Sequence, residues 1–223
     1  NGRPFRVAGP PVNPVPQNQF ANTQALDLNW ASTATGGWFD VPDTGGKLSM
    51  GDQDFTIEVW VKLNQLSNTS SADMRQTLVQ KKPASTGDKE LDYLVHVQRG
   101  NFVVTPNYGK TSGFTGRELQ IAFGTGSTFW GVTSNLQVSD LNWHLVSVAY
   151  DTVNDVVRFG LDTQFETLAF TQNPRITNAG PLRVGGHQNS TGTNNFFVRG
   201  RIDELRISRG VVPINRLLNH EPT

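Results

Sequence analysis

The chain has 223 residues, no cysteine, and 19 basic side chains against 19 acidic ones. Because neutralisation of phosphates supplies most of the affinity for nucleic acids, this balance of charge argues against a nucleic-acid-binding protein. The lack of cysteine excludes disulfides, thiolate catalysis and cysteine-held zinc. No apolar run reaches the length of about 18 residues that a membrane-spanning segment needs, so membrane insertion is not expected.

Residues 1–24 differ in composition from the rest of the chain. They contain prolines at positions 4, 10, 11, 14 and 16 and show no apolar periodicity. Proline fixes φ and removes a backbone donor, so the sequence predicts an extended arm here. Two interpretations stay open: a linker, or an arm that docks on a neighbouring protein.

Residues 25–223 are predicted to form one domain, in which short strand patterns alternate with turn residues. The patterns begin at 25–30 (ALDLNW) and 37–42 (GWFDVP). The strongest strand is Asp54–Leu63, where Phe55, Ile57 and Val59 lie on one face and Glu58 and Trp60 on the other. Further strand patterns follow at 75–82, 92–100, 101–107, 118–126, 144–151, 156–162, 167–171, 182–186 and 196–209.

Helical spacing is confined to the segment 212–220 (VPINRLLNH), which begins close to a proline. Many short strands with almost no helix are typical of an all-β, two-sheet antiparallel sandwich or jelly roll. The absence of a repeated blade pattern argues against a propeller.

Three stretches carry a resemblance to a known family: DFTIEVWVKL (54–63), NWHLVSVAYD (142–151) and GRIDELRISRGV (200–211). In this order they resemble laminin G-like, concanavalin A-type jelly rolls, a group that includes the pentraxins. The resemblance runs from Leu26 to Leu218 and implies the sandwich fold, but one fold hosts many activities. In this family a hairpin turn usually contains the dipeptide Asp-Gly, and the corresponding residues here are Asp162 and Thr163. Because a type I′ turn favours glycine, we expect this hairpin to have a longer loop or a different turn type.

Catalytic patterns are weak. Sandwich glycosidases place two carboxylates roughly 5–10 Å apart across a cleft. The comparable pairs here, Asp52 with Asp54 and Asp40 with Asp43, lie at predicted loop ends. The histidines share no metal-ligand spacing, and no Gly-x-Ser-x-Gly motif occurs. We therefore predict a protein that is not an enzyme, with a polysaccharide hydrolase or lyase as the minority alternative.

Asp203 is the candidate metal ligand. The resemblance implies that the aspartate of IDEL lies where the last strand crosses the first, near a structural calcium ion in some members. A carboxylate together with main-chain carbonyls suits Ca²⁺. The alternative is that Asp203 accepts hydrogen bonds from backbone amides at a strand junction. Trp60 and Trp143 occupy core-strand positions and are expected to pack rather than to bind a ligand.

Three loops combine aromatic side chains with planar polar ones. Sugar recognition uses an aromatic face for stacking and amide or guanidinium groups for hydroxyls. The candidate ligand-binding residues are Tyr108, Phe114 and Arg117 in the first loop, Phe129 and Trp130 in the second, and His187, Asn189 and Asn194 in the third. Two alternatives remain: the aromatic side chains fix the loops onto the sandwich, or they form a protein interface.

These patterns favour a surface recognition or attachment module that is carbohydrate-binding or adhesive and belongs to a larger assembly. Its expected partners are glycans, neighbouring protein subunits, or both, and its expected location is extracellular, on a cell surface or on a virion. The alternative is a structural virion protein, such as a phage decoration or tail-appendage subunit, whose arm docks on neighbouring subunits. The resemblance also supports this alternative, because such sandwiches occur in phage surface proteins.

Overall fold

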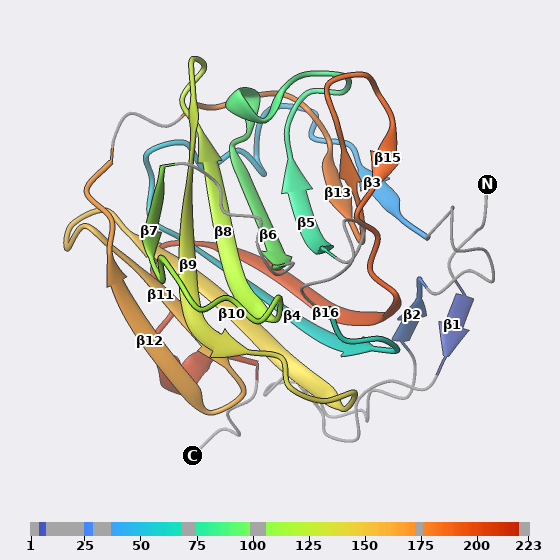
Figure 1. Ribbon diagram of the computed structural model, residues 1–223. Coiled ribbons are helices and arrows are strands. Elements are labelled where there is room, and N and C mark those ends of the chain that lie inside the picture. The colour runs from blue at the N-terminus through green and yellow to red at the C-terminus, as the bar shows by residue number, and fades with distance from the viewer. Residues whose placement is uncertain are drawn as a thin grey trace.

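The computed structural model describes residues 5–7, 25–28, 37–67, 75–98, 106–172 and 176–218. Two seven-stranded sheets pack against each other as a sandwich (Figure 1). The helices of the described residues are two short 3₁₀ turns, η1 (Asp88–Glu90) and η2 (Ile214–Arg216), and no described helix is long and apolar enough to cross a membrane. The predicted all-β sandwich is therefore confirmed.

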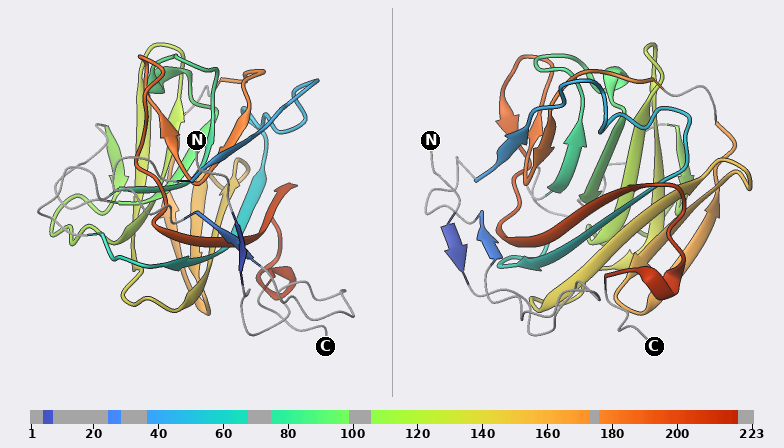
Figure 2. Two further views of the ribbon diagram at one scale, coloured as in Figure 1. Left: turned by 90° about the vertical axis from the view of Figure 1, so that its right-hand side faces the viewer. Right: turned by 180° about the vertical axis from the view of Figure 1, so that it is seen from behind.

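The first sheet, called sheet A, is antiparallel throughout. In spatial order its strands are β1 (Phe5–Val7), β2 (Ala25–Asp27), β16 (Gly200–Arg209), β4 (Phe55–Leu63), β10 (Trp143–Asp151), β11 (Val156–Leu161) and β12 (Gln164–Ala169). Strand β4 pairs with β10 on one side and with β16 on the other (Figure 2). The three stretches that carried the family resemblance are therefore neighbours at the centre of one sheet.

The second sheet, called sheet B, is antiparallel except where β7 runs parallel to β9. In spatial order its strands are β3 (Phe39–Val41), β13 (Leu182–Val184), β5 (Gln76–Lys81), β6 (Tyr93–Val97), β8 (Glu118–Gly124), β9 (Phe129–Gln137) and β7 (Asn107–Gly109). A small hairpin of β14 (His187–Gln188) and β15 (Asn194–Asn195) follows β13 and contacts β5. The outer face of sheet B, which points away from the core, thus carries an additional element near its β3 edge.

Strand alternation builds the core between the sheets. Phe55, Ile57 and Val59 of β4 are buried in it, as their spacing predicted. Trp60 points to the opposite face of β4 and packs in a separate apolar cluster with Trp143 and with the buried side chains Leu145, Leu217 and Leu218. The packing role predicted for both tryptophans is confirmed, and the C-terminal segment covers this part of sheet A.

Two local expectations can be compared with the structure. The β11–β12 hairpin has a two-residue loop, because Leu161 pairs with Gln164, so of the two possibilities expected there the longer loop is wrong and the different turn type is confirmed. Asp162 has a positive φ of 55° and Thr163 does not, which departs from the type I′ turn that needs positive φ at both positions. The helical spacing at 212–220 yields the 3₁₀ turn η2 rather than an α-helix.

The predicted N-terminal arm lies largely outside the described residues. Its described part is strand β1, which pairs with β2 at the edge of sheet A. This part of the arm therefore contacts its own domain.

Candidate functional site

The sequence-predicted ligand residues lie in three separate places. Tyr108 on β7 and Trp130 on β9 both pack against Phe170, with ring centroids 5.2 and 6.2 Å apart respectively. Phe170 is fully buried, so these two rings contribute to the core. Phe129 is half-buried where β9 begins, opposite Gly124 of β8. For Tyr108 and Trp130, the structure thus shows the loop-fixing contacts that were the alternative to ligand binding.

Phe114 and Arg117 belong to the loop between β7 and β8, which is arranged around the buried carboxylate of Glu118. That carboxylate accepts hydrogen bonds from the amides of Thr115 (2.8 Å) and Arg117 (3.0 Å) and pairs with Lys110 at 2.7 Å. Burial raises the pKa of Glu118, but Lys110 and the amides lower it more, so the net shift is downward. Phe114 lies beneath the Lys110 ammonium, 5.8 Å from the ring centre.

The third group lies in the β14–β15 hairpin. His187 is only 2% exposed, and its ring is held by Asn195 Oδ1 at 2.8 Å and Asp88 Oδ1 at 3.0 Å. Asn189 accepts hydrogen bonds from the amides of Thr191 and Thr193, which closes the hairpin loop. These contacts give His187 and Asn189 structural roles within the hairpin. Asn194 instead faces the neighbouring sheet.

Asn194 leads to a cluster that the sequence did not single out. Arg183, the central residue of β13, points to the outer face of sheet B because Leu182 and Val184 on either side are in the core. Its guanidinium forms a two-point ion pair with Asp40 of β3, with N–O distances of 2.8 and 2.9 Å. The guanidinium lies 3.9 Å above the ring of Trp38 and also donates to Asn194 Oδ1. Trp38 itself is half-buried.

Two further side chains complete the cluster. The main-chain N–H of Gln188 on β14 donates to Gln80 Oε1 on β5 (3.0 Å), which joins the hairpin to the sheet, and the Gln188 side chain donates to Asn194 Oδ1 (3.4 Å). Gly186 lies between Phe197 and Trp38, since a Cβ there would meet Phe197 Cδ1 at 3.0 Å and Trp38 Cβ at 3.3 Å. We call the group Trp38, Asp40, Arg183, Gln188, Asn194 and Phe197 the Trp38 platform.

Charges beside the platform are paired within the protein. Asp88 lies 3.0 Å from His187 and 3.6 Å from Lys82. Burial raises the pKa of Asp88, but the hydrogen bond from His187 and the charge of Lys82 lower it below its usual value. Burial also lowers the pKa of Lys82, and Arg183 acts in the same direction. The charged groups beside the platform are therefore compensated inside the protein, while the Asp40 side chain is 30% exposed.

The sequence contained a signal for part of this platform. The alternations Phe39-Asp40-Val41 and Leu182-Arg183-Val184 place Asp40 and Arg183 opposite the core, as strand periodicity predicts. Their adjacency could not be read from the sequence, because it depends on the pairing of β3 with β13 across 143 positions.

Asp203 lies in β16 at a bulge, where the register with β4 shifts between Asp203 and Arg206. Its carboxylate accepts a hydrogen bond from the Glu204 amide (2.9 Å), which agrees with the backbone-amide alternative. Burial and the neighbouring Asp203 raise the pKa of Glu204. Both side chains line a cavity of about 280 Å³ with Phe39 and Ile202. Within the described ranges no three acidic or histidine side chains are grouped to hold a metal ion, so calcium binding by Asp203 stays a prediction.

The carboxylate pairs considered for catalysis have other partners. Asp40 is paired with Arg183, and Asp43 lies 3.1 Å from the ammonium of Lys81. Asp54 accepts hydrogen bonds from the amide and the hydroxyl of Thr152 at 2.8 and 2.5 Å. These contacts explain the three carboxylates structurally.

The sequence from 33 to 213 matches a family model described as the concanavalin A-like lectin/glucanases superfamily. No sequence among the curated proteins matches the chain.

Solved structures with a similar fold share little sequence identity with this chain. The binding domain of Paraclostridial Mosquitocidal Protein 1 is 12% identical with a TM-score of 0.62, and the match covers 97% of this chain and 44% of that one. Domain 4 of AbnA, an extracellular arabinanase from Geobacillus stearothermophilus, solved with arabinotriose, is 18% identical with a TM-score of 0.58 over 98% and 81% of the two chains. The CBM40 domain of a Ruminococcus gnavus sialidase, bound to α2,3-sialyllactose, is 12% identical with a TM-score of 0.56 over 81% and 94%. This chain thus spans less than half of the toxin chain and most of each of the other two.

Proposed function

The chain belongs to the concanavalin A-like lectin/glucanase superfamily, and we propose that it is a non-catalytic carbohydrate-binding module that acts outside the cell or on a surface. We assign the glycan site to the Trp38 platform. The module would attach a larger assembly to glycans, with neighbouring protein subunits as further partners.

The arrangement of Trp38 carries this proposal. Its half-buried indole stacks on Arg183, and Asp40 holds that guanidinium from the adjacent strand at two points. An aromatic ring held in one orientation can stack on the C–H face of a sugar without losing conformational entropy on binding. The side-chain N–H groups of Asn194 and the Asp40 carboxylate, which is 30% exposed, would supply donors and acceptors for sugar hydroxyls.

The similar structures support binding rather than catalysis. They include a toxin binding domain and a sialidase CBM40 domain, and two of them were solved with arabinotriose or sialyllactose bound. These ligands belong to those proteins, and they provide the first probes for this one.

The proposal is tested by glycan-array binding, followed by affinity measurements with α2,3-sialyllactose, arabinotriose and any array hit. Trp38→Ala is expected to weaken binding by about tenfold or more, because it removes the stacking surface. Trp143→Ala is the matched control, since Trp143 is also half-buried but lies on sheet A. Circular dichroism confirms that each variant is folded.

Three outcomes would contradict the proposal. No binding to any glycan would rule out a carbohydrate-binding role. Equal losses in Trp38→Ala and Trp143→Ala would show a general loss of folding rather than a site. Loss of binding in folded Tyr108→Ala or Trp130→Ala, with Trp38→Ala unchanged, would place the site at the loops indicated by the sequence. If no glycan binds, deletion of residues 1–24 tests the assembly alternative, which requires impaired assembly of a folded sandwich.

A further inference from the structure

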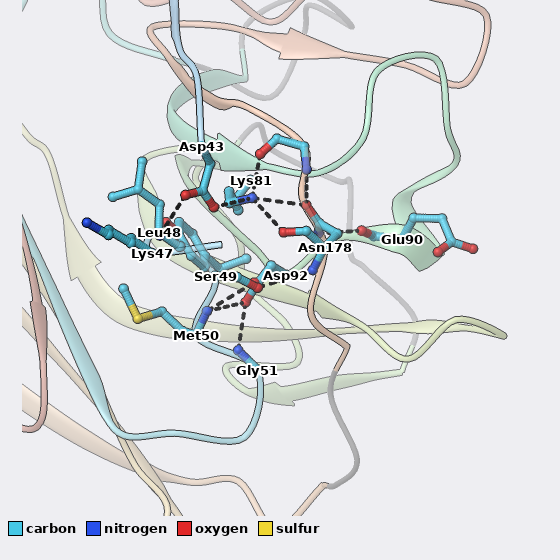
Figure 3. A network of polar contacts seen from close by, with 12 residues as sticks. Asp43, Lys47, Leu48, Ser49, Met50, Gly51, Lys81, Glu90, Asp92 and Asn178 are labelled. Atoms are coloured by element: carbon cyan, nitrogen blue, oxygen red, sulfur yellow. Dashed lines mark hydrogen bonds and ion pairs between the residues drawn. The ribbon is translucent and has the colours of Figure 1, made fainter. Parts of the chain in front are cut away.

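A buried ammonium lies at the end of the sandwich, in surroundings made of oxygen atoms. Lys81, the last residue of β5, is 0% exposed. Figure 3 shows its Nζ atom beside Asp43 and Asn178. The Nζ–O distances are 3.1 Å to Asp43 Oδ2, 2.8 Å to the main-chain oxygen of Asn178 and 3.2 Å to its Oδ1, and Nζ also donates to the main-chain oxygen of Gly180. One carboxylate, one amide oxygen and two carbonyls form the type of donor set that Ca²⁺ takes in proteins.

These oxygens come from segments far apart in the sequence. Asp43 belongs to the β3–β4 connection, whereas Asn178 and Gly180 precede β13. A second carboxylate, Asp92, reinforces the junction by accepting hydrogen bonds from Ser49 Oγ and from the amides of Met50 (3.0 Å) and Gly51 (3.1 Å) (Figure 3). Ser49 Oγ in turn accepts from the Asn178 amide at 3.1 Å. The two connections are thus joined to each other and to β5.

The space around the ammonium is closed. The Asp43 side chain is 2% exposed, and its Oδ1 accepts from the Leu48 amide at 3.1 Å. At Gly180 a Cβ would lie 2.1 Å from the main-chain oxygen of Lys82, so only glycine permits this close approach. If the ammonium were removed, its oxygen partners would be left buried without the positive charge that compensates them, an arrangement that is strongly unfavourable.

We propose that the Lys81 ammonium is a tethered cation that holds these connections together as a structural metal ion would, and that shortening Lys81 converts its oxygen cage into a divalent-cation site. The natural chain then needs no added metal at this junction. Strand β3 is only three residues long, and Asp43 follows it closely. The lysine therefore also anchors the edge strand that carries Asp40 of the Trp38 platform.

The test is thermal unfolding of the full chain with EDTA, CaCl₂ or MgCl₂. Calcium bound elsewhere, for example at Asp203, would raise Tm equally in the natural sequence and in every Lys81 variant, so the junction is judged by the additional gain of a variant over the natural chain. Lys81→Ala, which opens the cage, is expected to lower Tm by about 10 °C in EDTA, the usual consequence of breaking a buried ion pair. CaCl₂ at about a hundredfold excess over Kd should restore about 5 °C or more, and MgCl₂ less, because Mg²⁺ demands octahedral geometry and gives up its water reluctantly.

Lys81→Met is the matched control, because it removes the charge but keeps the cage filled. It should be destabilised as Lys81→Ala is and should gain no more from calcium than the natural chain does. The proposal is overturned if Lys81→Ala gains no stability from CaCl₂, if Lys81→Met gains as much, or if the natural chain is stabilised by CaCl₂ to the same extent. If Lys81→Ala does not fold in EDTA, refolding is carried out in CaCl₂: recovery of folded protein supports the cage, and failure to recover any overturns it. None of these results depends on glycan binding.

Discussion

Replacing Arg183 by lysine separates the geometry of the guanidinium from its charge. Arg183 is 6% exposed in its side chain and Asp40 30%, so their pair is only partly screened by solvent. Lysine keeps one charged contact to Asp40 but loses the second N–H···O bond and the stacking on Trp38. A charge-assisted hydrogen bond contributes about 1.5–3 kcal/mol and a cation–π contact about 0.5–2 kcal/mol. Because lysine retains part of the attraction and Asp40 is partly hydrated, we expect a net loss of about 2 kcal/mol in the free energy of unfolding.

The assay is urea unfolding at constant pH and ionic strength, with glycan affinity measured on the same samples. Arg201→Lys is the matched control, because Arg201 also faces an aspartate across paired strands, Asp27, but at 3.6 Å and with a side chain 31% exposed. It should lose less than about 0.5 kcal/mol. Arg183→Lys should also weaken glycan binding, since Trp38 loses the group on which it stacks. Equal losses of stability in the two variants would refute the special role of the Arg183 geometry.

Two further predictions concern parts of the fold away from the platform. Phe170→Ala removes the ring that Tyr108 and Trp130 contact and should cost about 4 kcal/mol in urea unfolding, whereas a loss below about 1 kcal/mol would show that these rings do not share a core. The hydrogen bond to Asp162 raises the pKa of His144 above its usual value. The stability that protonated His144 contributes is therefore complete below about pH 6.5 and is lost as the pH rises through the pKa of the folded state. His144→Gln should therefore flatten the change in Tm between about pH 6 and pH 9, and an unchanged slope would contradict this origin.

The amino-acid sequence alone determined the central strands of this protein, because the alternation of apolar and polar residues that identifies a strand lies within the strand itself. The alternation in Asp54–Leu63 assigned Phe55 to the core and Trp60 to the opposite face, and both assignments are confirmed. When every second residue of a strand is apolar, only the face that carries those residues can be buried in the core, whichever strands pair with it. The loop aromatics were less informative, because an aromatic ring beside glycine suits both a ligand surface and a loop packed on a core.

Tertiary structure alone decided what the polar side chains do. Arg183 and Asp40 become partners because β13 pairs with β3, and this pairing then sets Trp38 on the guanidinium. Lys81 is the last residue of a strand, a position where a lysine side chain is ordinarily exposed to solvent. It is buried here because the segments containing Asp43 and Asn178 close around it. Long-range pairing brings together groups whose separation in the sequence carries no periodic signal. The sandwich could therefore be predicted from the chain, whereas the platform and the oxygen cage required its folded arrangement.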